Sequence, residues 1–324
     1  MNATGWFFRK STAVARATRF LAVAVLAVPV LTSCVSRISY RELAQEYYNL
    51  GNAFFDLGDF ERSYQYYQRA VELDSSLPAA GYNLGRLHLQ RGEYDSALEV
   101  MERLLESDPE NGLYLETVAY IHFQAEAYDR AREGYTALIE TFPGRSRLRY
   151  NLALLELDQG RPEIALEVLL EGADIAGDDG DYSWLIAEAA YEGEDYQQAE
   201  LYLDRYRTLM KDNDAAQVKL ARRYAVWDYP LAALDVLSDV PRTVNGDPAL
   251  MFLESRLILT ATPDFDGGLA RLHEALDGGF DDDDELVALI EDLRPTDREV
   301  VRAVINDRGL LPEIDNDSSD DEAE

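Results

Sequence analysis

Cysteine and basic residues are both scarce in this sequence. One Cys, Cys34, is present among 324 residues, so an intrachain disulfide and any metal site built from several Cys ligands are excluded. Lys and Arg number 30 against 62 Asp and Glu, which gives a formal net charge of −32. A protein that binds nucleic acid replaces phosphate counterions with a basic surface, and this chain has too few bases to form one. The composition therefore argues against nucleic acid as a partner.

Long hydrophobic runs are also missing. The N-terminal segment contains an apolar run of 11 residues, 20–30, which is too short to span a bilayer. No other run approaches the roughly 18 residues that a spanning helix needs. Arg9, Lys10, Arg16 and Arg19 precede the apolar run, and no acidic residue lies among them. A basic stretch followed by a short apolar run is typical of a secretory signal peptide.

The apolar run leads into Leu31-Thr32-Ser33-Cys34. This sequence resembles the lipobox of bacterial lipoproteins, in which an apolar residue and two small residues precede the modified Cys. The resemblance implies a signal peptide over residues 1–33, cleavage before Cys34 and an acylated tether over residues 34–40. It also implies diacylglycerol on the Cys34 thiol and a further acyl chain, such as palmitate, on the new amine. The alternative is an uncleaved N-terminal helix with a structural Cys.

The residue after Cys34 bears on localisation. Val35 stands where an Asp would be the inner-membrane retention signal of enteric bacteria. The resemblance therefore favours a lipid-anchored protein of the bacterial cell envelope, in the outer membrane and facing the periplasm. Two or three acyl chains on Cys34 would anchor the chain stably, because stable anchoring takes more than one chain.

The remainder of the chain has a 34-residue period. Small residues recur at this spacing in two ladders, and large apolar residues precede the first of them. The ladders are Gly51, Gly85, Ala119, Ala153 and Ala187, then Ser63, Ala97, Ala131, Ala165 and Ala199. Aromatic residues occupy four of the five positions that lie three residues before the second ladder. These ladders share one register, which indicates a structural repeat.

Each repeat has the pattern of two helices joined by a turn. Apolar residues recur at helical spacing, as in Tyr47, Leu50 and Phe54. Gly58-Asp59 and Gly92-Glu93 interrupt this pattern in the middle of their repeats, as turn residues do. The two small-residue ladders fit the places where the two helices of one hairpin approach closely. The sequence therefore predicts an all-α chain built from helix pairs.

This pattern resembles the tetratricopeptide repeat (TPR), whose 34-residue motif has large, small and aromatic residues and a Pro at fixed places. Repeat one carries the motif at Tyr47, Leu50, Gly51, Phe54, Ser63, Tyr67 and Ala70. Repeat two carries it at Leu84, Gly85, His88, Ala97, Met101, Leu104 and Pro109. The resemblance covers residues 41–211 as five repeats, with Pro162 as a departure at an aromatic position. It implies a right-handed superhelical solenoid of antiparallel helix pairs.

The resemblance weakens after the fifth repeat. Residues 213–280 are interpreted as two degenerate helix-pair repeats. The first of these is predicted over residues 218–238, with Tyr229 in the aromatic position and Ala232 in the small position. The second is predicted over residues 248–276, with Phe265 and Gly268 in those positions.

The C-terminal segment is predicted to close the solenoid. Residues 281–310 are interpreted as capping helices, because a solenoid otherwise exposes the apolar face of its last repeat. Residues 311–324 are rich in Asp and Glu and are predicted to form an acidic disordered tail.

In the TPR family, the first helix of each repeat lines a concave groove that binds ligands. The resemblance implies that this groove is rich in aromatic side chains here, and aromatic residues are common anchors of binding surfaces. The implied groove residues are Tyr48, Asn52, Phe55, Tyr82, Arg86, Glu116, Tyr120, Phe123, Tyr150, Trp184, Glu188 and Tyr191. The alternative is that many of these aromatic residues only pack helices together. Basic residues that clamp a peptide carboxylate in chaperone-binding relatives are missing, so a chaperone tail is not expected as the ligand.

Catalytic and cofactor motifs are not found in the sequence. A phosphate-binding Gly loop, His-Glu-x-x-His and Gly-x-Ser-x-Gly are all missing. His88 and His122 lie one period apart, and stacked repeats would place them about 10 Å from each other, too far to share one metal ion. The acidic clusters at 178–181 and 281–285 do not match the spacing of an EF-hand loop. We therefore expect no enzymatic activity, no metal site and no cofactor.

Two functions remain open from the sequence. The first is a lipid-anchored envelope adaptor or scaffold that binds other proteins or peptides through a TPR groove. The second is a lipoprotein that binds or exports exopolysaccharide or cell-wall glycan, in which the aromatic groove stacks sugar rings. Both predict membrane attachment through the lipid on Cys34.

Overall fold

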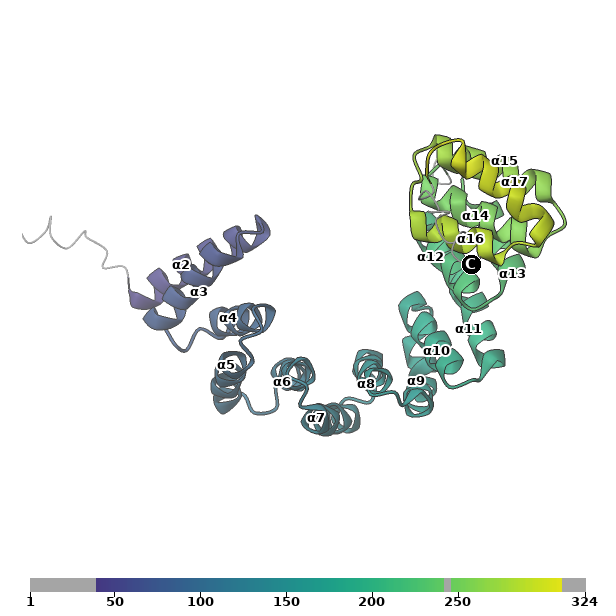
Figure 1. Cartoon of the computed structure of the whole chain (residues 1–324). Helices are drawn as coiled ribbons and strands as arrows, with labels where there is room; N and C mark the ends of the chain where they lie inside the picture. Colours follow the sequence, from purple (N-terminus) through teal and green to yellow (C-terminus); the bar gives the residue numbers. More distant parts are fainter. Residues whose placement is uncertain (1–38, 242–245, 311–324) are drawn as a thin grey trace, which may run out of the picture. The chain divides into compact units, whose positions relative to one another are not determined.

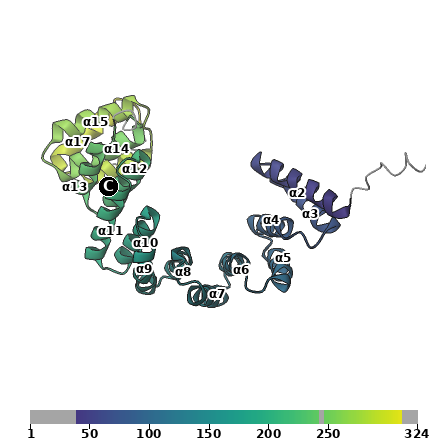
Figure 2. The same cartoon turned by 180° about the vertical axis from the view of Figure 1, so that it is seen from behind.

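The computed structural model describes residues 39–241 and 246–310, and these residues form 16 helices and no strand. Cys34, the signal peptide and the acidic tail predicted from the sequence lie outside the described residues. The helices form hairpins, shown in Figure 1 and from behind in Figure 2. The chain divides into two compact units, one up to Thr141 and one from Phe142. None of the described helices is both long and apolar enough to cross a membrane.

The first unit contains three helix pairs; the two helices of each pair pack on each other, and α3 packs on α4 and α5 on α6. The helices are α2 (Tyr40–Asp56), α3 (Phe60–Leu73), α4 (Pro78–Gln90), α5 (Tyr94–Ser107), α6 (Gly112–Gln124) and α7 (Tyr128–Thr141). Tyr67, Met101 and Tyr135 are fully buried at equivalent positions of α3, α5 and α7. Tyr67 and Met101 fill the space beside Gly51 and Gly85 of the first ladder, where an added Cβ would meet their side chains.

The second unit contains four further pairs and two closing helices. The pairs are α8 (Ser146–Asp158) with α9 (Pro162–Ala176), α10 (Gly180–Glu192) with α11 (Tyr196–Leu209), α12 (Asp214–Val226) with α13 (Pro230–Asp239), and α14 (Pro248–Ala261) with α15 (Phe265–Asp277). The closing helices are α16 (Asp283–Asp292) and α17 (Pro295–Asn306).

The 34-residue period continues to the last hairpin without interruption. The first helices of pairs two to seven each begin one full period after the one before, at Pro78, Gly112, Ser146, Gly180, Asp214 and Pro248. The first small-residue ladder also continues through Ala221 and Ser255, both fully buried. We call the first helix of each pair helix A and the second helix B. The sequence similarity weakens after the fifth repeat, but the helix register does not.

The sixth hairpin differs from its sequence prediction in register. It begins at Asp214, four residues before the predicted start, and its fully buried small residue is Ala233. Ala232, which the sequence placed in that position, is only partly buried. Ala233 lies one period after Ala199, so the hairpin keeps the strict register.

The seventh hairpin agrees with its sequence prediction. Gly268 is buried on α15, as expected for the small position. A Cβ built on Gly268 would lie 2.7 Å from Leu259 Cγ, so a larger residue there would push α14 and α15 apart.

The turn inside each of the first six hairpins uses a residue with positive φ, whereas Thr262 of the seventh has a φ of −123°. These residues are also 34 positions apart, namely Gly58, Gly92, Glu126, Gly160, Glu194 and Asp228. Their φ angles lie between 58° and 74°, in the left-handed region that glycine tolerates best. The backbone imposes this conformation at each of these turns, even where the residue is Glu or Asp.

Helices α16 and α17 cover the end of the last hairpin. Leu272 of α15, Leu289 of α16 and Val301 of α17 are fully buried in one apolar cluster. Arg256 of α14 pairs with both Glu285 and Asp292 at 2.9 and 2.7 Å, which ties α14 to α16. These contacts bury the apolar face that the last repeat of a solenoid would otherwise expose.

Candidate functional site

The predicted groove residues of the first unit lie on helices α2, α4 and α6. Arg86 of α4 is exposed, and its guanidinium lies 5.8 Å from the ring centroid of Phe55 and 5.9 Å from that of Tyr82. Tyr82 in turn packs on Tyr114, the two ring centroids being 5.9 Å apart. A cation held between two aromatic rings is a preformed contact surface of the kind that dominates binding energy at protein interfaces.

Asn52 and Tyr48 have structural roles in the same unit. The hydroxyl of Tyr67 donates a hydrogen bond to Asn52 Oδ1 at 2.6 Å, and Asn83 Nδ2 donates to the same oxygen at 3.2 Å. The ring of Tyr48 packs on that of Tyr67 with centroids 5.9 Å apart. Burial raises the pKa of Tyr67, so its hydroxyl stays protonated and keeps donating. Asn52 therefore fixes the spacing of α2, α3 and α4 beside the exposed residues.

Helix α6 contributes the most exposed aromatic group of the predicted set. Tyr120 is 42% exposed, and its ring lies near that of Phe123, with centroids 6.4 Å apart and planes tilted by 58°. Phe123 also contacts Tyr128 of the following helix. Glu116 is partly buried one turn before Tyr120. Tyr120 and Arg86 are thus the two predicted residues of this unit whose side chains are exposed.

The predicted groove residues of the second unit are more buried. Trp184 is 8% exposed and lies 4.8 Å from Tyr206, ring centroid to ring centroid. Tyr191 stacks on Trp227 with centroids 3.9 Å apart. Tyr150 is partly buried, and burial raises its pKa. Many of these rings therefore pack helices together, which is the alternative that the sequence left open.

Glu188 is an acidic residue among the predicted groove residues of the second unit, and its side chain is largely buried. Its side chain is 14% exposed, and Arg223 Nη2 of α12 lies 2.9 Å from its Oε1. Burial raises the pKa of Glu188, while the positive charges of Arg223 and Lys219 act in the opposite direction. Removing one partner of such a pair would leave the other charge buried and uncompensated.

Helix α12 carries functional candidates that the sequence analysis missed. Lys219, Arg222 and Arg223 line a cavity of about 380 Å³ whose other walls include Trp184. The resemblance gave groove positions only for the five repeats over residues 41–211, so none was assigned to the sixth hairpin. The 34-residue period could have identified Arg222, because Arg222 lies one period after the predicted groove residue Glu188.

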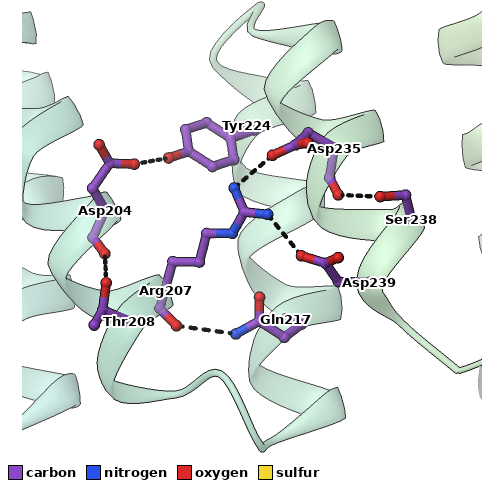
Figure 3. A network of polar contacts seen from close by, with 8 residues as sticks. All are labelled: Asp204, Arg207, Thr208, Gln217, Tyr224, Asp235, Ser238 and Asp239. Atoms are coloured by element: carbon purple, nitrogen blue, oxygen red, sulfur yellow. Dashed lines mark hydrogen bonds and ion pairs between the residues drawn. The ribbon is translucent and has the colours of Figure 1, made fainter.

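A polar network joins α11, α12 and α13 (Figure 3). Arg207 of α11 donates to Asp235 at 2.6 Å and to Asp239 at 2.9 Å, and both acceptors belong to α13. Gln217 of α12 donates to the main-chain oxygen of Met210 at 2.9 Å, just after the end of α11. The hydrogen bonds to Asp235 and Asp239 raise the pKa of Arg207. Helix α12, which carries the bases, is therefore tied to α11 by Gln217, while Arg207 ties α11 to α13.

His88 and the two acidic clusters have structural partners. His88 Nδ1 lies 2.5 Å from Glu93 Oε2, and the His88 ring meets the ring of Tyr64 edge-on. Asp179 accepts a hydrogen bond from the main-chain nitrogen of Tyr182 at 3.0 Å and caps α10. Asp282 caps α16 in the same way. No group of three or more potential metal ligands occurs in the part of the chain that the structure describes.

Comparison with family models agrees with this architecture. Two models described as tetratricopeptide repeat match residues 48–112, 82–146 and 122–189. Residues 48–189 thus match the tetratricopeptide repeat. The match stops within the fifth helix pair, although the helix register continues to Pro248 in the structure. A search of curated proteins finds no match.

Several solved TPR structures resemble the chain. MamA from Desulfovibrio magneticus RS-1 is 18% identical with a TM-score of 0.47, and the alignment covers 53% of this chain and 97% of MamA. PilF of Pseudomonas aeruginosa is 21% identical with a TM-score of 0.49, covering 67% of this chain and 98% of PilF. YrrB, described as a TPR protein with an unusual peptide-binding site, is 21% identical with a TM-score of 0.41, covering 52% of this chain and 88% of YrrB.

Proposed function

We propose that this chain is a non-catalytic scaffold that binds protein or peptide segments on the exposed faces of its A helices. The observation that carries the proposal is the placement of Arg86 between Phe55 and Tyr82, with Tyr120 exposed on the A helix of the following repeat. Aromatic and Arg side chains that are already ordered lose little conformational entropy on binding, so they contribute strongly to affinity.

The binding experiment compares variants of the exposed face with a control on helix B. Arg86→Ala and Tyr120→Ala remove exposed side chains of the A helices, and we expect each to reduce capture of partners from an envelope extract. Arg69→Ala is the matched control, since Arg69 is exposed on helix B of the first pair and forms an ion pair with Glu72 of its own helix at 2.7 Å. Captured proteins that persist in the Arg86→Ala, Tyr120→Ala double variant would contradict the proposed binding face.

Attachment to the envelope is the second part of the proposal. Cys34 lies outside the described residues, and the support is the basic leader, the short apolar run and the lipobox-like Leu31-Thr32-Ser33-Cys34. Acylation there would place the scaffold at the outer membrane, facing the periplasm. Cys34→Ser should leave an uncleaved precursor without lipid. If that variant still matured and remained in the membrane pellet without detergent, the lipoprotein proposal would be wrong.

The glycan-binding alternative depends on rings that can stack on sugars. Trp184 is poorly placed for this role, because the ammonium of Lys219 lies 3.7 Å from the centroid of its ring and the indole is 8% exposed. Titration with cell-wall and exopolysaccharide fragments separates the two functions. A scaffold for proteins should show no change in Trp fluorescence with these fragments, whereas stacking of sugars on Trp184 predicts a saturable change.

A further inference from the structure

Helix α12 carries a local excess of positive charge. Its bases Lys219, Arg222 and Arg223 line the same cavity of about 380 Å³. Acidic residues outnumber basic ones 62 to 30 in the chain, so three bases around one cavity are a local exception. A positive site on an acidic protein attracts anionic groups to that place while the rest of the surface repels them.

Lys219 is held in position by aromatic rings. Its Nζ lies 3.7 Å from the ring centroid of Trp184 and 5.6 Å from that of Tyr206. Within residues 39–241 and 246–310, no carboxylate forms a direct ion pair with Lys219. Burial lowers the pKa of Lys219, whereas the more distant charges of Asp181 and Glu188 raise it. The ammonium is therefore partly desolvated, oriented by the rings and available to donate to a ligand.

The two arginines differ in how firmly they are held. Arg223 pairs with Glu188 at 2.9 Å, and its guanidinium lies 5.7 Å from the ring centroid of Trp227. Arg222 reaches Asp247 only at 3.9 Å, and both of these side chains are more than half exposed. One Arg is thus fixed by a buried acid, and the other can turn towards a bound anion at little cost.

A second, larger cavity adjoins the first. It has a volume of about 1110 Å³ and shares Arg222 and Val226 with the smaller one. Val226 is 74% exposed, and the wall beside it is apolar, formed by Ala249, Phe252, Leu253 and Leu257. The remaining charged lining consists of Asp228, Asp282 and the Arg256 group, in which Arg256 pairs with Glu285 and Asp292. Lys219 and Arg222 are the bases of the joined cavities without a close carboxylate partner among the described residues, so carboxylates of a ligand would bind there and an apolar group would occupy the apolar part of the larger cavity.

We propose that these joined cavities bind an acidic peptide segment of a partner protein, with its carboxylates on Lys219 and Arg222 and a neighbouring apolar side chain against Val226 and Leu253. The inference rests on the proposed scaffold function and names the class of ligand that the C-terminal repeats take. Charge complementarity selects an acidic segment, and the apolar wall beside the bases favours a peptide over a simple polyanion.

The test measures peptide binding to the full-length protein in detergent by calorimetry. The probe is an amidated peptide with three consecutive Glu followed by Leu and Phe. Replacing its Glu residues by Gln should weaken binding about tenfold or more, because charge-assisted hydrogen bonds are lost. Lys219→Gln and Arg222→Gln should each weaken it by about tenfold. Lys211→Gln is the matched control, since Lys211 is exposed eight residues before Lys219 and lines neither cavity.

The apolar half of the site has its own pair of variants. Val226→Glu places a carboxylate where the two cavities meet and should abolish binding. Val287→Glu adds the same charge on α16, where Val287 is 37% exposed and outside both cavities, and should leave binding unchanged. Because both Val side chains are exposed, neither variant is expected to unfold the protein.

Four outcomes would overturn the inference. Equal weakening by Lys219→Gln and Lys211→Gln would mean that only the overall charge matters. Polyphosphate that binds as tightly as the peptide would assign the cavities to anions in general. Peptide binding seen only after deletion of residues 311–324 would assign the site to the acidic tail of the same chain. The fourth outcome is that the unchanged protein does not bind the peptide. If it still captures partners through Arg86 and Tyr120, this inference is wrong and the scaffold function remains supported.

Discussion

Tyr191 of α10 stacks face to face on Trp227 at the end of α12, with ring centroids 3.9 Å apart and planes 3° from parallel. The contact joins successive A helices of the second unit, and Trp227 is 6% exposed. We expect Trp227→Ala to lower the free energy of unfolding by about 3–5 kcal/mol, because a large buried aromatic group is replaced by a cavity. Urea unfolding followed by circular dichroism measures this change.

The control for Trp227 is Tyr196, which meets the same Tyr191 ring edge-on at 5.3 Å but is 49% exposed. Tyr196→Ala should cost clearly less than Trp227→Ala, since less apolar surface leaves water when Tyr196 packs. Equal costs for the two variants would show that the stacked pair is not what holds α10 and α12 together.

The turns with positive φ allow two substitutions of opposite effect. Glu126 has a φ of 58°, and Glu126→Gly should stabilise the chain by about 0.5–1 kcal/mol because glycine adopts this conformation without strain. Gly58 has a φ of 74°, and a Cβ placed on it would have no atom within 4 Å. Gly58→Ala should therefore destabilise by a similar amount through backbone strain alone. Thermal unfolding of both variants measures the two effects. Melting temperatures that shift in the same direction for both variants would contradict the prediction.

Stability should fall at alkaline pH through Tyr182. This side chain is 2% exposed, its hydroxyl donates to the main-chain oxygen of Leu169 at 3.0 Å, and burial raises its pKa to about 12. The pKa in the unfolded chain is about 10. The protonated phenol is favoured in the folded state, so its contribution is complete below pH 10 and disappears as the pH rises towards 12, at a cost of about 2–3 kcal/mol.

Tyr182→Phe provides the control for this pH dependence. It should lose about 1 kcal/mol at pH 7 with the hydrogen bond, and its stability should fall less steeply than that of the unchanged protein between pH 10 and 12. Urea unfolding at pH 7, 10 and 11.5 gives the comparison. Parallel curves for the two proteins would exclude Tyr182 as the group responsible.

The network around Arg207 should depend on salt (Figure 3). Arg207 bonds to two carboxylates of α13, Asp235 and Asp239, which are themselves about two-thirds exposed. We expect Arg207→Gln to destabilise by about 1–2 kcal/mol at low ionic strength and by less in 1 M NaCl, where charges are screened beyond about 3 Å. Arg69→Gln removes one exposed pair and should change stability by about 0.5 kcal/mol or less. A penalty for Arg207→Gln that is independent of salt would indicate lost packing instead.

The sequence predicted the helix pairs because their cause is local and periodic. Small residues recur where the helices of a pair approach, and a Cβ on Gly51 would lie 2.5 Å from the ring of Tyr67. In the sixth repeat the small position was assigned to Ala232, because Ala232 and Ala233 look alike and Tyr229 supplied an aromatic residue three positions earlier. The strict 34-residue period after Ala199 points to Ala233, and packing agrees with it, since Ala233 is fully buried and Ala232 is not.

Site residues were harder to predict than the fold. The position of a residue in helix A predicts the face on which its side chain lies. It does not predict whether a side chain of a neighbouring helix covers that side chain. Tyr120 remains exposed, whereas Trp184 is covered by Lys219 of α12 and Tyr206 of α11. The sequence of one repeat contains no information about the neighbour that packs on it.

The amino-acid sequence by itself determined the all-α class, the 34-residue register and the turn positions of the first repeats, because these depend on residue size and turn chemistry within one repeat. The tertiary structure decided which of the A-helix residues are exposed and which are buried. It also brought Lys219, Arg222 and Trp184 around one cavity, since the burial and charge of a side chain depend on contacts between helices that the periodic pattern does not specify.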